Sequence, residues 1–494
     1  MKYGSEYRRK LFLLVLITMM ITIAKAQSSL SFYSFDNQFN SSNYNPAFLT
    51  SPHKFTFSIV PLGGTTIGYN SQALIKDLLT KILSGENPDD DYYMNVLETM
   101  ANKPMFNQGI ESGMLNFTYR SKVGFLNFRI KDVQSFSASA KGELTKFILK
   151  SDSQSVIIDE IQNLPVQALH YREYSLGYSY QSPMNRFSAG IRAKLYFGKA
   201  ALYSSLSGSI NKEASDQYAF NTTGGLNLSF PEASKQSSSA TPDITNISGS
   251  KIADYLLNTG NMGIGVDLGF KYRFTPDLTV SMSVIDLGKI NWKKNLSSRN
   301  FEPFMLPDTS YYAPELGSVE IIKKDGYKYS KELPTYLNED SIPSSFSRQL
   351  PLTIYAGIKY RINPKLTISF TDRYISVKNL SYNSLSANAN IDINKKLSIS
   401  TGYSIIGDSY FNLPFAVLLK KDFGQMYFGT DNIASFLLPS ISDYASFSFG
   451  TCFYLFKNRE RKYDSASDEY PFYKSRKIKK SRKNGRIKTP FPES

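Results

Sequence analysis

The chain has 494 residues, a formal net charge of +15, one cysteine and two histidines. A single cysteine excludes an intrachain disulfide framework, and so few cysteines and histidines argue against a metal centre or histidine-dependent catalysis. The basic residues concentrate before residue 27 and after residue 456, so the body between them is nearly neutral.

The N-terminus has the pattern of a secretory signal peptide. Basic residues up to Lys10 precede an apolar run over residues 11–24, and Ala24-Lys25-Ala26 supplies the small residues of a cleavage site. The apolar run is shorter than the roughly 20 residues of a membrane-spanning helix. We therefore predict that residues 1–26 are a cleaved signal peptide and that the chain is exported.

Residues 27–111 are predicted to contain a first strand and a helical segment. The strand covers residues 54–61, and apolar residues follow at helical spacing over 72–83 and 92–101. Two placements are open for the helical part. It is a periplasmic or lumen-filling element, or it is a helical outer loop.

Residues 112–456 are dominated by an alternation of apolar and polar residues with a period of two. In the pair of stretches over 261–288, Ile264, Val266 and Leu268 share one face, and the same pattern recurs over 187–197 and 352–362. These stretches exceed the roughly 5–6 residues of an ordinary soluble strand. They reach the roughly 9–11 residues that a tilted strand needs to cross a bilayer.

The connections alternate between short and long. Tight turns rich in Pro, Asn, Asp and Gly, such as 275–277 and 394–396, lie between long connections over 231–260 and 289–349. An up-and-down barrel with short periplasmic turns and long outer loops has this organisation. We predict an all-β, transmembrane, antiparallel up-and-down β-barrel, with roughly 14–16 spans by direct count.

The inward face of these strands carries ionisable residues. If Ile191, Ile264 and Leu268 face lipid, the lumen-facing candidates are Asp267, Arg192, Lys194 and Arg129. Ionisable groups in a membrane span usually face a polar cavity and pair with each other. Two interpretations are open: a selectivity-setting interior for an anionic or amphipathic solute, and a structural salt-bridge network, which we favour.

Three glycines accompany this row. Gly263, Gly265 and Gly269 are predicted to leave room for a plug or loop to approach the wall, or to serve barrel curvature.

Residues 457–494 are highly charged and poor in aliphatic residues, which predicts a basic, disordered, periplasmic tail. Either the tail is attracted to anionic lipid head groups or an acidic periplasmic partner, or it is solvated without a specific partner. Export argues against nucleic acid as its partner.

Three stretches resemble known barrel families. Asn45-Pro46-Ala47 resembles the NPA motif of the FadL-type long-chain fatty acid transporter barrels and of the related PorV-like barrels of the Bacteroidota. Residues 263–292, GIGVDLGFKYRFTPDLTVSMSVIDLGKINW, are similar to the central signature of an uncharacterised barrel family (a domain of unknown function) from the same bacteria. Residues 423–432, FGQMYFGTDN, resemble the penultimate strand of that family.

This resemblance implies an outer-membrane barrel of about 14 strands, within a range of 12–16, with both termini in the periplasm. It also implies that Asn45, Pro46 and Ala47 belong to an inner hatch at the N-terminus. Chains of the family tend to stop near the last strand, so the tail at 457–494 is a departure from the pattern.

Two functions of different classes follow from the resemblance. The first is non-enzymatic, cofactor-free passage of small hydrophobic or amphipathic molecules across the outer membrane, with membrane lipid and a hydrophobic small molecule as partners. The second is a non-transporting scaffold of a secretion or surface-attachment machine, with outer loops such as 289–349 docking a partner protein.

Overall fold

The computed structural model describes residues 30–35, 38–51, 53–60, 63–70, 106–138, 158–161, 166–182, 185–213, 217–230, 255–301, 304–307, 310–315, 318–323, 337–339, 345–377, 380–437, 442 and 444–456. The predicted signal peptide at 1–26, the helical segment at 72–101 and the basic tail at 457–494 lie outside these residues.

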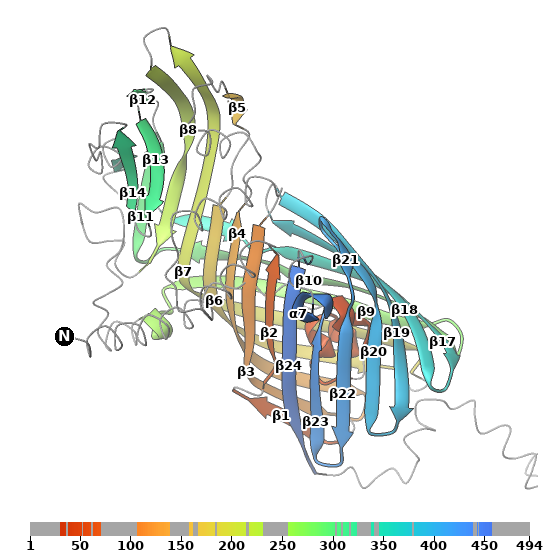
Figure 1. Ribbon diagram of the computed structural model, residues 1–494. Helices are drawn as coiled ribbons and strands as arrows, with labels where there is room; N and C mark the ends of the chain where they lie inside the picture. Colours follow the sequence, from red (N-terminus) through yellow and green to blue (C-terminus); the bar gives the residue numbers. More distant parts are fainter. Residues whose placement is uncertain are drawn as a thin grey trace, which may run out of the picture.

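The described strands close into an antiparallel barrel with 14 strand positions (Figure 1). Two consecutive strands, β1 (Phe55–Ile59) and β2 (Thr65–Asn70), share the first position, since both pair with β3 on one side and with β24 on the other. The remaining positions are β3 (Phe106–Arg120), β4 (Gly124–Ala138), β6 (Val166–Gln181), β7 (Phe187–Glu213), β9 (Asn261–Arg273), β10 (Leu278–Trp292), β17 (Leu352–Asn363), β18 (Leu366–Val377), β19 (Leu380–Asn394), β20 (Leu397–Ile406), β22 (Phe415–Lys421), β23 (Gly424–Thr430) and β24 (Tyr444–Leu455). The predicted fold is confirmed, and closure leaves the wall without an open edge.

The outer face of the barrel carries exposed apolar side chains. Ile191, Ile264 and Leu268, predicted to face lipid, are all exposed. Exposed aromatic residues gather near the short turns, namely Tyr180, Phe187, Tyr272, Phe274, Tyr360, Phe423 and Phe456. An apolar band edged by aromatic residues is what a barrel embedded in lipid requires. Of the helices described, none has both the length and the apolar character to span a membrane.

A second sheet projects beyond the barrel. Residues 201–213 of β7 continue past β9 and pair with β8 (Gln217–Ser229), which also pairs with β11 (Leu296–Phe301) and β12 (Phe304–Pro307). Figure 1 shows this sheet standing off the end of the barrel opposite the short turns. Part of the long connection predicted at 289–349 is therefore folded into strands. The shorter elements there and elsewhere are β5 (Ile158–Ile161), β13 (Ser310–Glu315), β14 (Ser318–Lys323), β15 (Leu337–Glu339), β16 (Phe346–Gln349), β21 (Ser409–Asn412) and α7 (Ala434–Leu437).

The N-terminal segment, which we define as the described residues between 30 and 51, lies inside the ring (red in Figure 1). It forms α2 (Leu30–Ser34) and two short 3-10 helices, η1 (Ser41–Asn43) and η2 (Pro46–Phe48). Nearly all of its residues are buried. Its apolar side chains form one cluster with residues of the wall: Leu30, Phe32, Tyr33, Phe35, Phe39, Tyr44, Phe48, Ile285, Tyr355, Ile406, Ala416, Leu418, Tyr427, Tyr444 and Cys452. The predicted plug-like segment is thus present in the lumen.

Candidate functional site

The four lumen-facing candidates lie on neighbouring strands and point to the interior. Arg192 on β7 is in register with Asp267 on β9, Lys194 follows Arg192 by one inward position, and Arg129 lies on β4. All four side chains are almost completely buried. Since side chains of one sheet face stand next to those on adjacent strands, the ring brings these residues together.

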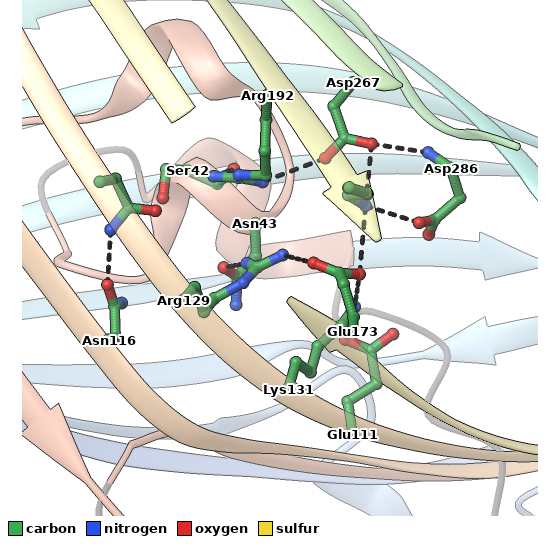
Figure 2. Close-up of polar contacts among 12 residues, drawn as sticks. Ser42, Asn43, Glu111, Asn116, Arg129, Lys131, Glu173, Arg192, Asp267 and Asp286 are labelled. Atoms are coloured by element: carbon green, nitrogen blue, oxygen red, sulfur yellow. Dashed lines mark hydrogen bonds and ion pairs between the residues drawn. The ribbon is translucent and has the colours of Figure 1, made fainter. Parts of the chain in front are cut away.

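These residues form ion pairs inside the barrel (Figure 2). Arg192 Nη1 lies 3.1 Å from Asp267 Oδ2, and Lys194 Nζ lies 2.8 Å from Asp267 Oδ1. Lys194 Nζ also lies 2.5 Å from Asp286 Oδ1. Inward-facing side chains of β7, β9 and β10 are therefore joined by one continuous set of ion pairs.

Glu173 on β6 connects Arg129 to this group. Its carboxylate lies 2.7 Å from Arg129 Nη2, 3.3 Å from Lys194 Nζ and 3.6 Å from Lys131 Nζ. Lys131 in turn pairs with Glu111 at 3.1 Å. The charged network, as we call it, consists of the cations Arg129, Lys131, Arg192 and Lys194 and the carboxylates Glu111, Glu173, Asp267 and Asp286. Positive and negative charges are equal in number, as burial of so many ions requires.

Sequence reasoning missed Glu173 and Asp286 as site residues. Glu173 could have been found, because it continues the inward row of Ser175, Gly177 and Ser179 by one more step of two. Asp286 lies at a β-bulge between Val284 and Leu287 and has a left-handed φ of 62°. A bulge changes which side chains face inward, and nothing in the alternation at this point predicts one.

The N-terminal segment is hydrogen-bonded to the charged network. Arg192 Nη2 donates to the carbonyl oxygen of Ser42 at 2.8 Å, and Arg129 Nη1 donates to Asn43 Oδ1. Next to them, Asn116 of the wall donates to Asn40 Oδ1 at 2.9 Å. Each of the two arginines thus binds a carboxylate of the wall with one nitrogen and the N-terminal segment with another.

Asn45, Pro46 and Ala47 form a compact turn against the wall. Asn45 Oδ1 accepts from the Ala47 N–H at 2.9 Å and so caps η2. Asn45 Nδ2 faces the Tyr33 hydroxyl at 3.2 Å and the carbonyl oxygens of Phe270 at 3.3 Å and Met282 at 3.1 Å. Burial raises the pKa of Tyr33 to about 12. Its neutral hydroxyl accepts from Asn45 and donates to Ser281 at 3.1 Å.

Two wall glycines make room for this turn. A Cβ at Gly269 would lie 2.1 Å from Asn45 Oδ1, and one at Gly190 would lie 2.3 Å from the Pro46 carbonyl carbon. Gly269 therefore has the predicted role of admitting a plug. Gly263 and Gly265 do not, since their inserted Cβ atoms would meet Ile290 and Tyr196 of the wall.

The other end of the N-terminal segment is held by Asp431, which follows β23. Asp431 accepts from the backbone N–H groups of Leu30 at 3.1 Å and Ser31 at 3.0 Å and from the Ser31 hydroxyl at 2.6 Å. Asn432, its neighbour, accepts from the N–H groups of Leu413 and Ala434 at 3.2 Å each. Asp431, near the end of the FGQMYFGTDN stretch, thus binds the first helix of the plug, and Asn432 fixes the chain around it.

We expect Asp431→Ala to release α2 while leaving the barrel closed. The substitution removes the acceptor of three hydrogen bonds from α2, and a hydrogen bond to a charged group is worth about 1.5–3 kcal/mol. Hydrogen exchange of the Leu30 and Ser31 amides should therefore accelerate at least tenfold. Asp431→Asn keeps one acceptor oxygen and should show a smaller increase, and equal protection in all three proteins would contradict the anchoring role.

His170 lies apart from this site, on the outward face of β6. Its Nε2 is 2.7 Å from Asp132 Oδ1, and its other ring nitrogen meets the Tyr255 hydroxyl. Arg172 shares the Asp132 carboxylate at 3.1 Å. This cluster holds the turn at 255–257 against the outside of the barrel.

Toward the projecting sheet the lumen becomes apolar. The aromatic mouth, as we call it, is the buried cluster Val133, Leu169, Tyr171, Tyr196, Ala201, Tyr203, Ile290, Trp292, Leu296 and Leu350, with Phe346 against it. It adjoins the charged network, because the Tyr196 hydroxyl donates to Asp286 Oδ1 at 3.2 Å. Barrel interiors are usually polar, so an apolar mouth is a distinctive feature.

Comparisons with known proteins identify one matching family and several solved structures of low sequence identity. Residues 46–431 match the model described as a family of unknown function (DUF5723). The search of curated proteins found no match. Among solved structures, the toluene transporter TodX of Pseudomonas putida shares 8% identity with a TM-score of 0.36, covering 84% of this chain and 92% of that one.

Two more solved structures are similar at the same level. The toluene transporter TbuX of Ralstonia pickettii shares 10% identity with a TM-score of 0.36, covering 83% of this chain and 90% of that one. The monoaromatic hydrocarbon channel CymD shares 11% identity with a TM-score of 0.35, covering 87% and 93%.

Proposed function

This chain belongs to the family of unknown function DUF5723, and from that premise and its lumen we propose that it passes small hydrophobic or amphipathic molecules across the outer membrane of a Gram-negative cell. In this proposal the N-terminal segment is a hatch, and the protein is neither an enzyme nor a cofactor carrier. Membrane lipid and a hydrophobic small molecule are its partners.

The observation that carries the proposal is how the hatch is attached. Among the described residues, the N-terminal segment pairs with no strand of the wall, and side-chain hydrogen bonds and the apolar cluster hold it instead. A segment held in this way can move without opening the backbone ladder of the barrel. Asn45, Pro46 and Ala47 of the hatch lie directly against Gly190 and Gly269 of the wall.

The lumen supports an apolar solute. The aromatic mouth is a packed apolar cluster on the outer side of the charged network, and in this proposal a hydrophobic molecule passes along it, because apolar side chains favour an apolar solute over an ion. Asp267, Arg192, Lys194 and Arg129 shape the interior below it, and their network is balanced in charge. A balanced network carries no net charge that would concentrate ions of one sign.

The rim of short turns supports the assignment of both termini to the periplasm. Phe55, which opens β1, is in register with Leu455, which ends β24, so the chain enters and leaves the barrel at one rim. That rim carries the short turns, and short turns are periplasmic in outer-membrane barrels. Export by the signal peptide at 1–26 is part of the same proposal.

A disulfide that locks the hatch tests the proposal. Ser34 Oγ on α2 lies 3.5 Å from Asn390 Oδ1 on β19. We expect Ser34→Cys with Asn390→Cys, in a Cys452→Ala background, to lose at least tenfold in uptake of an uncharged aromatic dye by proteoliposomes under oxidation. A reductant should restore the uptake.

Each single-cysteine variant serves as a control and should be insensitive to oxidation. Uptake that is unchanged by a quantitatively formed disulfide would contradict a moving hatch. Dye uptake no faster than in protein-free liposomes would contradict passage itself.

A second function is supported by the projecting sheet of β7, β8, β11 and β12, which reaches beyond the barrel. Here the closed barrel is a non-transporting scaffold of a secretion or surface-attachment machine, and the sheet docks a partner protein. Purification in mild detergent separates the two. A stoichiometric partner lost on deletion of residues 202–228 would favour the scaffold.

A further inference from the structure

An open cavity lies at the rim of short turns, at the lower ends of the blue strands in Figure 1. It has a volume of about 400 Å³ and lies between two hairpin turns that are neighbours in the barrel wall. Its lining residues are Asn394, Lys395, Lys396, Leu397, Leu419 and Lys421. No residue of the charged network or of the hatch lines it, so it is separate from the site described above.

The floor of the cavity faces lipid. Tyr427 on β23 accepts a hydrogen bond from the N-terminal segment at 3.0 Å and so points into the lumen, and Leu418 on β22 is in register with it. Since strand side chains alternate, the next pair in register, Leu419 and Met426, faces outward. Leu397 on β20 is in register with Leu419 and lies on the same face. The two leucines of the cavity therefore continue the apolar outer surface of the barrel.

Three lysines surround this floor. Asn394 Oδ1 accepts from the Lys396 N–H at 2.8 Å, and the Lys396 carbonyl oxygen accepts from the Lys420 N–H at 2.7 Å, so the turn is fixed to the neighbouring strand. Lys395, Lys396 and Lys421 are exposed. None of these three forms an ion pair with a carboxylate among the described residues. Their ammonium groups are thus available to an anion.

The charge around the cavity is positive. Residues 392–397 and 419–422 hold four lysines and two aspartates, and one of these acids, Asp392, accepts a hydrogen bond from Ser398. Phe423, the next residue of the second turn, is 67% exposed, and exposed aromatic residues mark the bilayer interface in membrane barrels. The cavity therefore joins a basic rim to an apolar floor at the level of lipid head groups.

We propose that this cavity binds an anionic glycerophospholipid of the leaflet that surrounds the short turns. The lipid phosphate accepts hydrogen bonds from Lys395, Lys396 and Lys421, which as charged donors bind it strongly, and an acyl chain lies on Leu397 and Leu419. Lysines near a membrane surface attract anionic lipids. This inference rests on the barrel lying in lipid and is independent of what passes through its lumen.

The apolar floor favours a lipid over other anions. A soluble anion such as inorganic phosphate would contact the lysines and leave Leu397 and Leu419 unused, and an acidic peptide in the periplasm would not reach the side that faces acyl chains. Lysine side chains lie along apolar surface while their ammonium groups stay at the polar interface. A phospholipid matches both halves of the cavity, because it carries a charged head group and an apolar chain in one molecule.

Lipid-dependent quenching of fluorescence tests the site. Met426→Cys in a Cys452→Ala background places a bimane label beside the floor without changing a lining residue. The protein is reconstituted in phosphatidylcholine vesicles that contain brominated phosphatidylglycerol or, at the same mole fraction, brominated phosphatidylcholine. We expect the phosphatidylglycerol to quench the label with an association constant higher by about fivefold or more. This preference should shrink at about 1 M salt, which screens the lysine charges.

Charge variants separate lipid binding from structure. Lys396→Ala with Lys421→Ala should lose most of the preference, whereas Lys396→Arg with Lys421→Arg should keep it. Lys365→Ala is the matched control, because Asn363 Oδ1 accepts from the Lys365 N–H at 2.8 Å in a similar turn that does not line the cavity. Heat-modifiable migration reports that each variant is folded.

Equal quenching by the two lipids in the protein with all three lysines would overturn the proposal. A preference that survives the alanine pair, or an equal loss in Lys365→Ala, would do the same. Sodium phosphate and sodium chloride are then compared at equal ionic strength. The same reduction by both salts supports a lipid site, and displacement by phosphate alone would assign the cavity to a soluble anion instead.

Discussion

Glu173→Ala is expected to lower the free energy of unfolding by about 3–5 kcal/mol, the range for removing one partner of a buried ion pair. The Glu173 side chain is fully buried and faces Arg129, Lys131 and Lys194. Without it, Arg129 keeps no carboxylate partner among the described residues, and Lys131 and Lys194 each lose one of their carboxylate partners. We expect the variant to unfold at much lower denaturant concentration.

The measurement is urea-induced unfolding in lipid vesicles. Trp292 is the single tryptophan of the chain and lies in the aromatic mouth, so its fluorescence reports loss of the interior. Asp277→Ala is the matched control, because Asp277 pairs with Arg361 at 2.8 Å at the exposed rim. An exposed pair contributes at most about 1 kcal/mol, so equal losses in both variants would contradict the structural importance of the charged network.

Gly190→Ala is expected to displace the hatch and to open the lumen to ions. The added Cβ would lie 2.3 Å from the Pro46 carbonyl carbon and 2.6 Å from the Ala47 nitrogen. These are backbone atoms, which cannot rotate away as a side chain can. Overpacking of this kind costs typically about 1–3 kcal/mol, and the hatch, which no strand pairing holds, is the part that yields.

Single-channel conductance in planar bilayers checks this expectation. We expect Gly190→Ala to raise the open-state probability at least tenfold, and Gly190→Val to raise it further. Gly177→Ala on the neighbouring strand is the control, because its Cβ would have 3.5 Å to the nearest atom, an ordinary contact. Wild-type conductance in both Gly190 variants, with the protein folded, would contradict this expectation. It would show that η2 shifts locally but stays in place against the wall.

The sequence was sufficient to assign which side chains of each strand point inward and which point outward. A period of two is a local property, so it assigned Asp267, Arg192, Lys194 and Arg129 to the interior and Ile264 and Leu268 to the outside without knowledge of the neighbours. The number of strands could also be estimated, because tight turns mark their ends.

Pairing across the interior was decided by the tertiary structure. Arg192 meets Asp267 because β7 and β9 are adjacent and in register, although β8 lies between them in the chain and pairs with the projecting part of β7. Asp286 enters the network through a bulge, which shifts the inward row by local backbone geometry. Alternation predicts a face, but it carries no information about register.

The position of the hatch in the lumen depends most on closure of the barrel. Leu30 and Asp431 are 401 residues apart in the chain, yet they are joined by a hydrogen bond. The sequence by itself determined an alternating, membrane-type wall with charged residues on its inner side, because that information is contained in neighbouring residues. The tertiary structure decided the pairing of the charges, the glycines that pack against the hatch and the acid that binds its first helix. These depend on closure of the barrel, because closure brings residues that are distant in the chain into contact.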